Sequence, residues 1–276
     1  MGSQRVPLEM FWRRDILNVR NCSSLQTRRE PNFMAIETID LTRQELLAKS
    51  VSPLAAQPQR IRALELLLVM SVAFAPLIVN SAFALWKTPD TGFLQFRIAS
   101  LILHECISLA VFFYVLSQQR RCLRDIGFQL RLPDLGIGIL LAIGGVLASA
   151  FSQVGLYLGQ QITGYTWQES AANSNVLGGL SLASIVLVLV NPVFEELLVR
   201  GYLASELSFL TRSTWLPLAA SVLLQASYHL YQGIPNVIAL TACFLVWGIY
   251  FNQTRRLGPI IFAHLYLDIL GLLRST

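Results

Sequence analysis

The sequence has little charge, since Asp, Glu, Lys and Arg together make up 13% of its 276 residues. A soluble domain of ordinary composition has about 25% charged residues. Hydrophobic residues account for 54%, and the mean hydropathy is +0.55. Low charge combined with long apolar runs is typical of proteins that cross a membrane several times. We therefore expect an all-α, polytopic bundle of transmembrane helices.

Several motifs of soluble enzymes are missing from the sequence. It has no HExxH, no GxSxG, no P-loop and no GxGxxG that opens a helix, so zinc-protease, esterase and nucleotide-binding functions have no support. The cysteines include no pair with the spacing of metal ligands. The net charge of +5 does not indicate nucleic-acid binding, because the basic residues cluster between apolar runs and in the N-terminal region. We expect no nucleic-acid partner.

Seven apolar runs approach the length that a bilayer crossing requires, about 17–25 residues. They cover residues 63–86, 94–117, 135–160, 180–208, 214–232, 235–252 and 258–273. A kink in the fourth run would divide it into two helices and raise the number of spans to eight. Residues 1–60 are polar and predict a cytoplasmic N-terminal region that is partly disordered, whereas residues 61–276 form the transmembrane helical domain.

Arginines gather in alternate connections between these runs. Arg120, Arg121, Arg124 and Arg131 lie between the second and third runs, Arg212 between the fourth and fifth, and Arg255 and Arg256 between the sixth and seventh. Connections rich in Lys and Arg stay in the cytoplasm. The pattern predicts a multi-pass protein with a cytoplasmic N-terminus, and the compact chain suggests a prokaryotic plasma membrane.

The most unusual stretch reads FEELLVRGY and places Glu195, Glu196 and Arg200 inside an apolar run. Each such group costs about 2.5–3.5 kcal/mol at the centre of a bilayer, so ionisable groups there are rare and usually functional. Pro192 predicts a kink just before the acidic pair, because proline removes a backbone donor and clashes with the preceding turn. Irregular backbone in a bilayer has to find other partners or line a wet cavity. We expect a polar cavity open toward the cytoplasm.

The two glutamates of this stretch are expected to have different roles. Glu196 and Arg200 are four residues apart, so they share a helix face and can pair. Glu195 points about 100° away from Glu196 and is free for another role, such as that of a general base. Both glutamates could instead serve only to hold spans together through salt-bridged contacts.

All three histidines of the chain lie in apolar runs. His229 is expected at a depth close to that of Glu195, so the two side chains could meet. His264 is expected to lie shallower and is followed, four residues later and on the same helix face, by Asp268. One free carboxylate and two histidines can activate a water molecule for hydrolysis.

Three motifs in this order resemble those of the CAAX protease and bacteriocin-processing family of intramembrane proteases, which includes the type II CAAX prenyl endopeptidases. FEELLVRGYL is similar to the EExxxR motif of that family. Gln225-x-x-x-His229 resembles its FxxxH motif, with a glutamine in place of the aromatic residue that we take as a packing change. His264-x-x-x-Asp268 fits the third motif, a histidine followed four residues later by Asn or Asp. The family-like core covers about residues 125–273.

The resemblance implies an intramembrane endopeptidase that hydrolyses a peptide bond near the cytoplasmic face. Glu195 would be the general base, and His229 would help to orient the attacking water. His264 and Asp268 would line the site and stabilise the oxyanion. Prenyl-processing members favour Asn at the last position, and an ionised carboxylate cannot donate to an oxyanion. We therefore expect Asp268 to orient His264 or to help bind a metal.

The resemblance also implies supporting and structural roles. Glu196 and Arg200 would form a supporting pair beside the catalytic groups. His104 and Glu105 match no motif of the family and are interpreted as structural, because an intramembrane histidine often bridges helices through hydrogen bonds.

The implied mechanism depends on a glutamate and requires no cofactor, although two histidines and carboxylates could hold zinc. The expected partners are the lipid bilayer and a membrane peptide or protein substrate. One alternative is a non-proteolytic scaffold, immunity or regulatory protein that retains the protease fold. Another is a transporter with an ion pair at the membrane midplane, which would require broken helices in both halves of the chain. Only one broken run is found.

Overall fold

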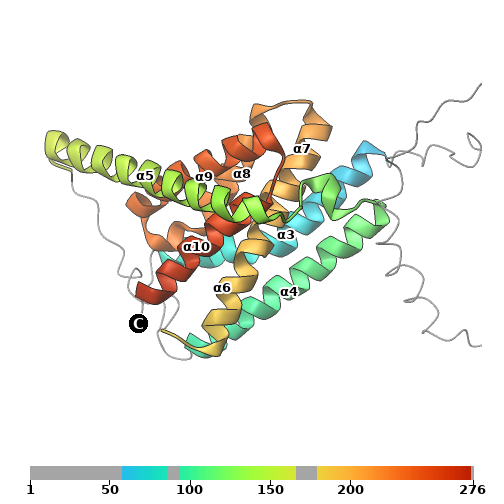
Figure 1. The fold of residues 1–276 in the computed structure, drawn as a ribbon, viewed down its shortest axis with the longest axis horizontal. Helices are drawn as coiled ribbons and strands as arrows, with labels where there is room; N and C mark the ends of the chain where they lie inside the picture. Colours follow the sequence, from blue (N-terminus) through green and yellow to red (C-terminus); the bar gives the residue numbers. More distant parts are fainter. Residues whose placement is uncertain (1–57, 86–93, 166–178, 275–276) are drawn as a thin grey trace, which may run out of the picture. The chain divides into compact units, whose positions relative to one another are not determined.

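The protein is described by a computed structural model that covers residues 58–85, 94–165 and 179–274. All of these residues except Pro58 belong to a unit that runs from Gln59 to Thr276, and its helices are shown in Figure 1. The described residues are helical throughout apart from short connections and contain no strand, so the predicted all-α class is confirmed for this part of the chain. The region predicted for residues 1–60 lies almost entirely outside the described residues.

Five helical segments of the described residues are long and apolar enough to cross a membrane. They are α3 (Gln59–Ala84), α4 (Leu94–Gln118), α5 (Leu132–Thr163), the continuous run Leu182–Thr211, and α9 (Ile234–Thr254). Two further predicted spans are the helices α8 (Trp215–Tyr228) and α10 (Gly258–Arg274), of 14 and 17 residues. The helix α8 is shorter than the about 17–25 residues that a crossing requires, and α10 is at the lower limit of that range. The protein is an integral membrane protein, but the predicted number of seven or eight spans is not confirmed.

The outer faces of the long helices carry large apolar side chains. Leu67 of α3, Leu103 of α4 and Phe151 of α5 are 62%, 61% and 76% exposed. Soluble proteins rarely expose wide apolar patches, whereas a surface in contact with lipid requires them. Trp215, at the start of α8, is also largely exposed, and tryptophan is enriched where a membrane meets water.

The run Leu182–Thr211 has the predicted irregular backbone, in the form of a π-helix. It consists of α6 (Leu182–Glu195), the π-helix η4 (Glu196–Leu203) and α7 (Ala204–Thr211). Pro192 lies inside α6, and the helix type changes at Glu196, four residues later. All eight residues of η4 are buried. The run therefore remains one helical segment, and the irregular turn begins between the two adjacent glutamates.

Two glycines of α5 allow close packing against its neighbours. A Cβ atom added at Gly138 would lie 2.7 Å from a side-chain carbon of α10, and one added at Gly145 would lie 2.4 Å from a cysteine sulfur of α9. A Cβ at Gly136 would meet nothing within 4 Å, and one at Gly144 would have an ordinary contact at 3.8 Å. Of these four glycines, Gly138 and Gly145 are the two that close packing requires.

Short helical turns complete the unit. The 3-10 helix η2 (Leu123–Ile126) lies in the connection between α4 and α5, and η5 (Leu230–Gln232) joins α8 to α9. Gly127 follows η2 with φ of 89°, and its carbonyl accepts a hydrogen bond from the backbone N–H of Leu257 at 3.0 Å. This bond fixes the α4–α5 connection to the corner between α9 and α10.

The close approach of α5 to α9 and α10 can be tested with paired alanine variants. Gly138→Ala and Gly145→Ala should each destabilise the protein by about 1–3 kcal/mol, because the added methyl group overpacks the contact. Gly136→Ala and Gly144→Ala should leave stability unchanged or slightly raised, since alanine favours a helix. Thermal unfolding in detergent measures the difference. Equal melting temperatures for all four variants would contradict the packing.

Candidate active site

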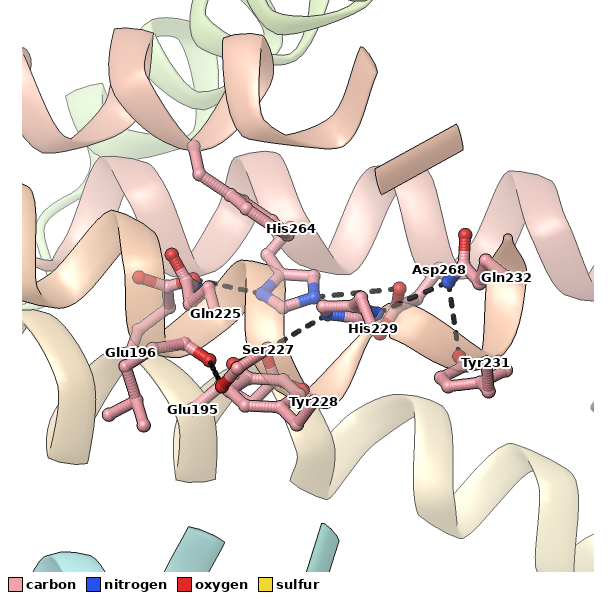
Figure 2. A network of polar contacts seen from close by, with 12 residues as sticks. Glu195, Glu196, Gln225, Ser227, Tyr228, His229, Tyr231, Gln232, His264 and Asp268 are labelled. Atoms are coloured by element: carbon pink, nitrogen blue, oxygen red, sulfur yellow. Dashed lines mark hydrogen bonds and ion pairs between the residues drawn. The ribbon is translucent and has the colours of Figure 1, made fainter. Parts of the chain in front are cut away.

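The candidate site is centred on the junction between α6 and η4. Glu195 is the last residue of α6 and Glu196 the first of η4, and both side chains are buried. His229 follows the C-terminal end of α8, and His264 lies on α10. Figure 2 shows that these four side chains, from separate elements, form one network of polar contacts. The structure therefore brings together the groups that the sequence predicted to meet.

Glu195 is held by a tyrosine and faces a histidine. The hydroxyl of Tyr228 donates a hydrogen bond to Oε2 of Glu195 at 2.6 Å. Nε2 of His229 lies 3.9 Å from the same oxygen and has no hydrogen-bond partner among the described residues. Nδ1 of His229 lies 3.2 Å from the amide nitrogen of Gln232. That amide donates, so Nδ1 accepts and the proton of the neutral ring is on Nε2, which faces Glu195.

Glu196 connects α10 to the π-helix. Its Oε1 lies 2.9 Å from Nδ1 of His264, and its Oε2 pairs with Arg200. A carboxylate held by an arginine only accepts, so Nδ1 of His264 is the donor. Nε2 of His264 lies 3.7 Å from Oδ1 of Asp268, which is too long for a hydrogen bond. The expected pairing of Glu196 with Arg200 is observed, whereas His264 is oriented by the hydrogen bond that it donates to Glu196 and not by the expected one to Asp268.

Gln225 stands where the resembling motif has an aromatic residue. Its side chain is fully buried, and its Oε1 accepts a hydrogen bond from Nη2 of Arg200 at 2.6 Å. The same nitrogen of Arg200 lies 3.4 Å from the backbone carbonyl of Phe244 on α9. The departure from the motif is thus more than the packing change expected from the sequence, because the glutamine ties α8 to the π-helix through the arginine.

Glu105 is a further buried carboxyl near this cluster, which sequence reasoning left as structural. It lies on α4, is fully buried, and neither of its oxygens has a hydrogen-bond partner among the described residues. Its carboxyl lies close enough to Glu195, His264 and Asp268 for an electrostatic interaction. Its depth in an apolar run was the signal that could have identified it. The neighbouring His104 lies 2.9 Å from a backbone carbonyl of α3, as expected for a helix-bridging histidine.

The described residues contain no group of three His, Cys, Asp or Glu side chains arranged to hold a metal ion. The zinc considered from the sequence therefore finds no fitting set of ligands in this part of the chain. Two pockets of the structure, one lined by arginines and one apolar, do not include Glu195, His229 or His264. The polar cavity open toward the cytoplasm stays a prediction.

Comparison with protein families finds a match to part of the chain. The family model described as type II CAAX prenyl endopeptidase Rce1-like matches residues 178–270. This segment contains the acidic pair, Arg200 and both histidines of the site. Neither a curated protein nor a solved structure matches the chain.

The buried pair of Glu196 and Arg200 predicts a large effect of removing one partner. Arg200→Met should destabilise the protein by about 3–5 kcal/mol, because it leaves a buried carboxylate without its cation. The double variant Arg200→Met/Glu196→Gln should recover most of this loss. Unfolding in detergent micelles measures both. A double variant that is no more stable than Arg200→Met would show that the pair is not the source of the effect.

Replacing the buried carboxyl of Glu105 is expected to raise stability, in contrast to replacing Arg200. Glu105→Met should stabilise the protein by about 1–3 kcal/mol, because it removes a buried polar group with no hydrogen-bond partner in the structure. Glu206→Met is the matched control, since Glu206 is also fully buried but pairs with Arg62 and Arg121. The control should destabilise the protein, and melting temperatures compare the two. A lower melting temperature for Glu105→Met would refute the assignment.

Proposed function

Residues 178–270 carry a domain of the Rce1-like type II CAAX prenyl endopeptidase family, and on this basis we propose that the protein is an intramembrane endopeptidase. The observation that carries the proposal is the placement of Glu195 and His229, from different helices, with 3.9 Å between Oε2 and Nε2. The bond cleaved lies near the cytoplasmic face, and the N-terminus lies in the cytoplasm of a prokaryotic cell.

The attacking water is activated between Glu195 and His229. A separation of 3.9 Å allows one water to form hydrogen bonds of about 2.8 Å to both atoms. The carboxylate of Glu195 accepts a proton from this water, and Nε2–H of His229 donates to the water oxygen. The resulting hydroxide attacks the carbonyl carbon of the peptide bond. Tyr228 supports the step by fixing the orientation of the Glu195 carboxylate.

His264 stabilises the oxyanion that this attack creates. Its Nδ1 is held by Glu196, so Nε2 of the protonated ring is the nitrogen that donates to the oxyanion. Asp268 stabilises the positive ring from 3.7 Å. When the tetrahedral intermediate collapses, the C–N bond breaks and Glu195 returns its proton to the leaving amine. Glu196 and Arg200 keep the ring in position throughout. No metal is needed for these steps.

The substrate is a membrane peptide or membrane protein, presented from the bilayer in which the protein lies. The family is described as a prenyl endopeptidase family, so prenylation is a further feature proposed for this substrate. A panel of membrane peptides with and without a prenylated C-terminal CAAX sequence tests it.

The proposed chemistry is tested by cleavage of this panel with purified protein. Glu195→Gln and His229→Ala should each lower the cleavage rate at least about 10²-fold, as expected for loss of a general base or its partner. Both variants should remain folded by thermal unfolding. His104→Gln serves as the control, because its ring contacts a backbone carbonyl of α3 and has no hydrogen bond or ion pair to the acidic pair in the described structure, and it should cleave at the wild-type rate. Equal rates for Glu195→Gln and wild type would disprove the mechanism.

A non-proteolytic scaffold, immunity or regulatory protein is the second candidate function. The observation in its favour is the burial of the cluster, with neither pocket including its catalytic side chains. This function predicts no cleavage of any peptide by the wild type. It also predicts that Glu195→Gln retains the biological role.

A further inference from the structure

A pocket lined by arginines lies where α3 begins and where α4, α7 and α9 end. It has a volume of about 440 Å³. Arg62 of α3, Arg121 and Arg124 of the α4–α5 connection, and Arg255 after α9 all line it. None of the residues of the candidate active site lines this pocket, so it requires a separate explanation.

Two of the four arginines are fixed by one buried carboxylate. Arg62 donates to both oxygens of Glu206, from Nε at 2.9 Å and from Nη2 at 2.7 Å, and Arg121 pairs with the same side chain. The guanidinium of Arg62 also stacks over the ring of Phe209, 3.6 Å from its centre. One negative charge therefore faces two positive charges, and both guanidinium groups are held in place.

The other two arginines have no acidic partner among the described residues. Arg124 and Arg255 are exposed, and neither forms an ion pair within the described part of the chain. Nη2 of Arg255 donates only to the hydroxyl of Ser208, at 3.3 Å. Asp125 also lines the pocket, and its Oδ2 accepts a hydrogen bond from the backbone N–H of residue 122 at 2.7 Å. Within the described part of the chain, four arginines thus face two carboxylates at this pocket, which leaves two positive charges uncompensated.

The backbone around the pocket brings Arg124 and Arg255 to the same place. Ile126, at the end of η2, is fully buried, and Gly127 bonds to Leu257 just after Arg255. A Cβ atom at Gly127 would lie 2.4 Å from the backbone oxygen of Arg255, so the two segments touch. Because the contact is between backbone atoms, the two arginines converge without any ligand.

The position of the pocket in the membrane identifies the class of ligand. Most of the described arginines at helix ends lie at the same end of the unit as the pocket. They are Arg60, Arg62, Arg120, Arg121, Arg124, Arg131, Arg212, Arg255 and Arg256. Among the described arginines, only Arg97 and Arg274 lie at the opposite ends of their helices. This is the end that the positive-inside rule places at the cytoplasmic headgroups. Guanidinium groups bind phosphate oxygens in a fixed geometry.

We propose that this pocket binds the phosphate group of an anionic membrane lipid from the cytoplasmic leaflet. Basic pockets between transmembrane helices on this side commonly hold such headgroups. The exposed Arg124 and Arg255 bind the phosphate, while Arg62 and Arg121 supply a fixed positive wall. The proposal does not depend on the protein being a peptidase.

The test titrates the purified full chain in detergent with dioleoyl phosphatidylglycerol, dioleoyl phosphatidylcholine or inorganic phosphate, and follows the melting temperature. The wild type should gain stability with phosphatidylglycerol and little with the zwitterionic lipid or with free phosphate. Arg124→Gln/Arg255→Gln should weaken the apparent affinity for phosphatidylglycerol at least about tenfold, since each cation near a headgroup contributes about 1 kcal/mol.

The matched control is Arg120→Gln/Arg212→Gln. It removes the same charge from the same end of the unit, and neither arginine lines the pocket. Arg255 shares a left-handed backbone with both control arginines, with φ of 53° against 51° and 55°, so its substitution is comparable in strain to theirs, whereas Arg124 lies in the helix η2. The control should bind phosphatidylglycerol as the wild type does. If both double variants lost affinity for phosphatidylglycerol equally, the effect would be one of general surface charge, and the proposed binding site would be wrong. Tight binding of inorganic phosphate, lost in the pocket variant, without binding of phosphatidylglycerol would overturn the lipid as its source.

Discussion

Burying two adjacent carboxylates inside an apolar helical unit is the constraint on which the rest of the site depends. A buried carboxylate needs a cation or several hydrogen-bond donors to stay in place. Neighbouring residues of a helix point in directions about 100° apart, so Glu195 and Glu196 can reach different partners. Glu196 is bound by Arg200 and His264, whereas Glu195 accepts a hydrogen bond from a tyrosine hydroxyl and faces Nε2 of His229, which has no hydrogen-bond partner among the described residues. Both oxygens of Glu196 therefore have partners, whereas Glu195 is the carboxylate that the proposed mechanism uses as the base.

The π-helix η4 is the backbone element that carries the buried ion pair. Pro192 cannot donate a backbone hydrogen bond, and four residues later the helix widens into η4. Single π turns are rare and are often found at functional sites. Here the widened turn carries both Glu196 and Arg200, and every residue in it is buried. Gln225 of α8 accepts a hydrogen bond from Arg200. This bond links the π-helix to the helix α8, which positions Tyr228 and His229.

The buried arginine of the site and the arginines near the helix ends differ in how their charges are balanced. Arg200 is fully buried, and its charge is matched by Glu196. Near the helix ends, Glu206 faces both Arg62 and Arg121, and Arg124 and Arg255 have no acidic partner in the described structure. A buried charge without a partner would be too costly to keep, but at the helix ends water or a lipid headgroup can supply one. The excess of positive charge is therefore confined to the level at which a phosphate group would meet it.

The sequence by itself determined the features that depend on neighbours along the chain. Apolar runs placed the long helices, the four-residue spacing placed Arg200 beside Glu196, and Pro192 indicated irregular backbone next to them. Tertiary structure alone decided that Tyr228 and Gln225 bind the charged groups, that Glu105 lies near them, and that α8 and α10 are shorter than a usual span. The reason is geometric. Spacing along one helix defines which of its side chains share a face, but which faces meet depends on how separate helices pack and rotate against one another.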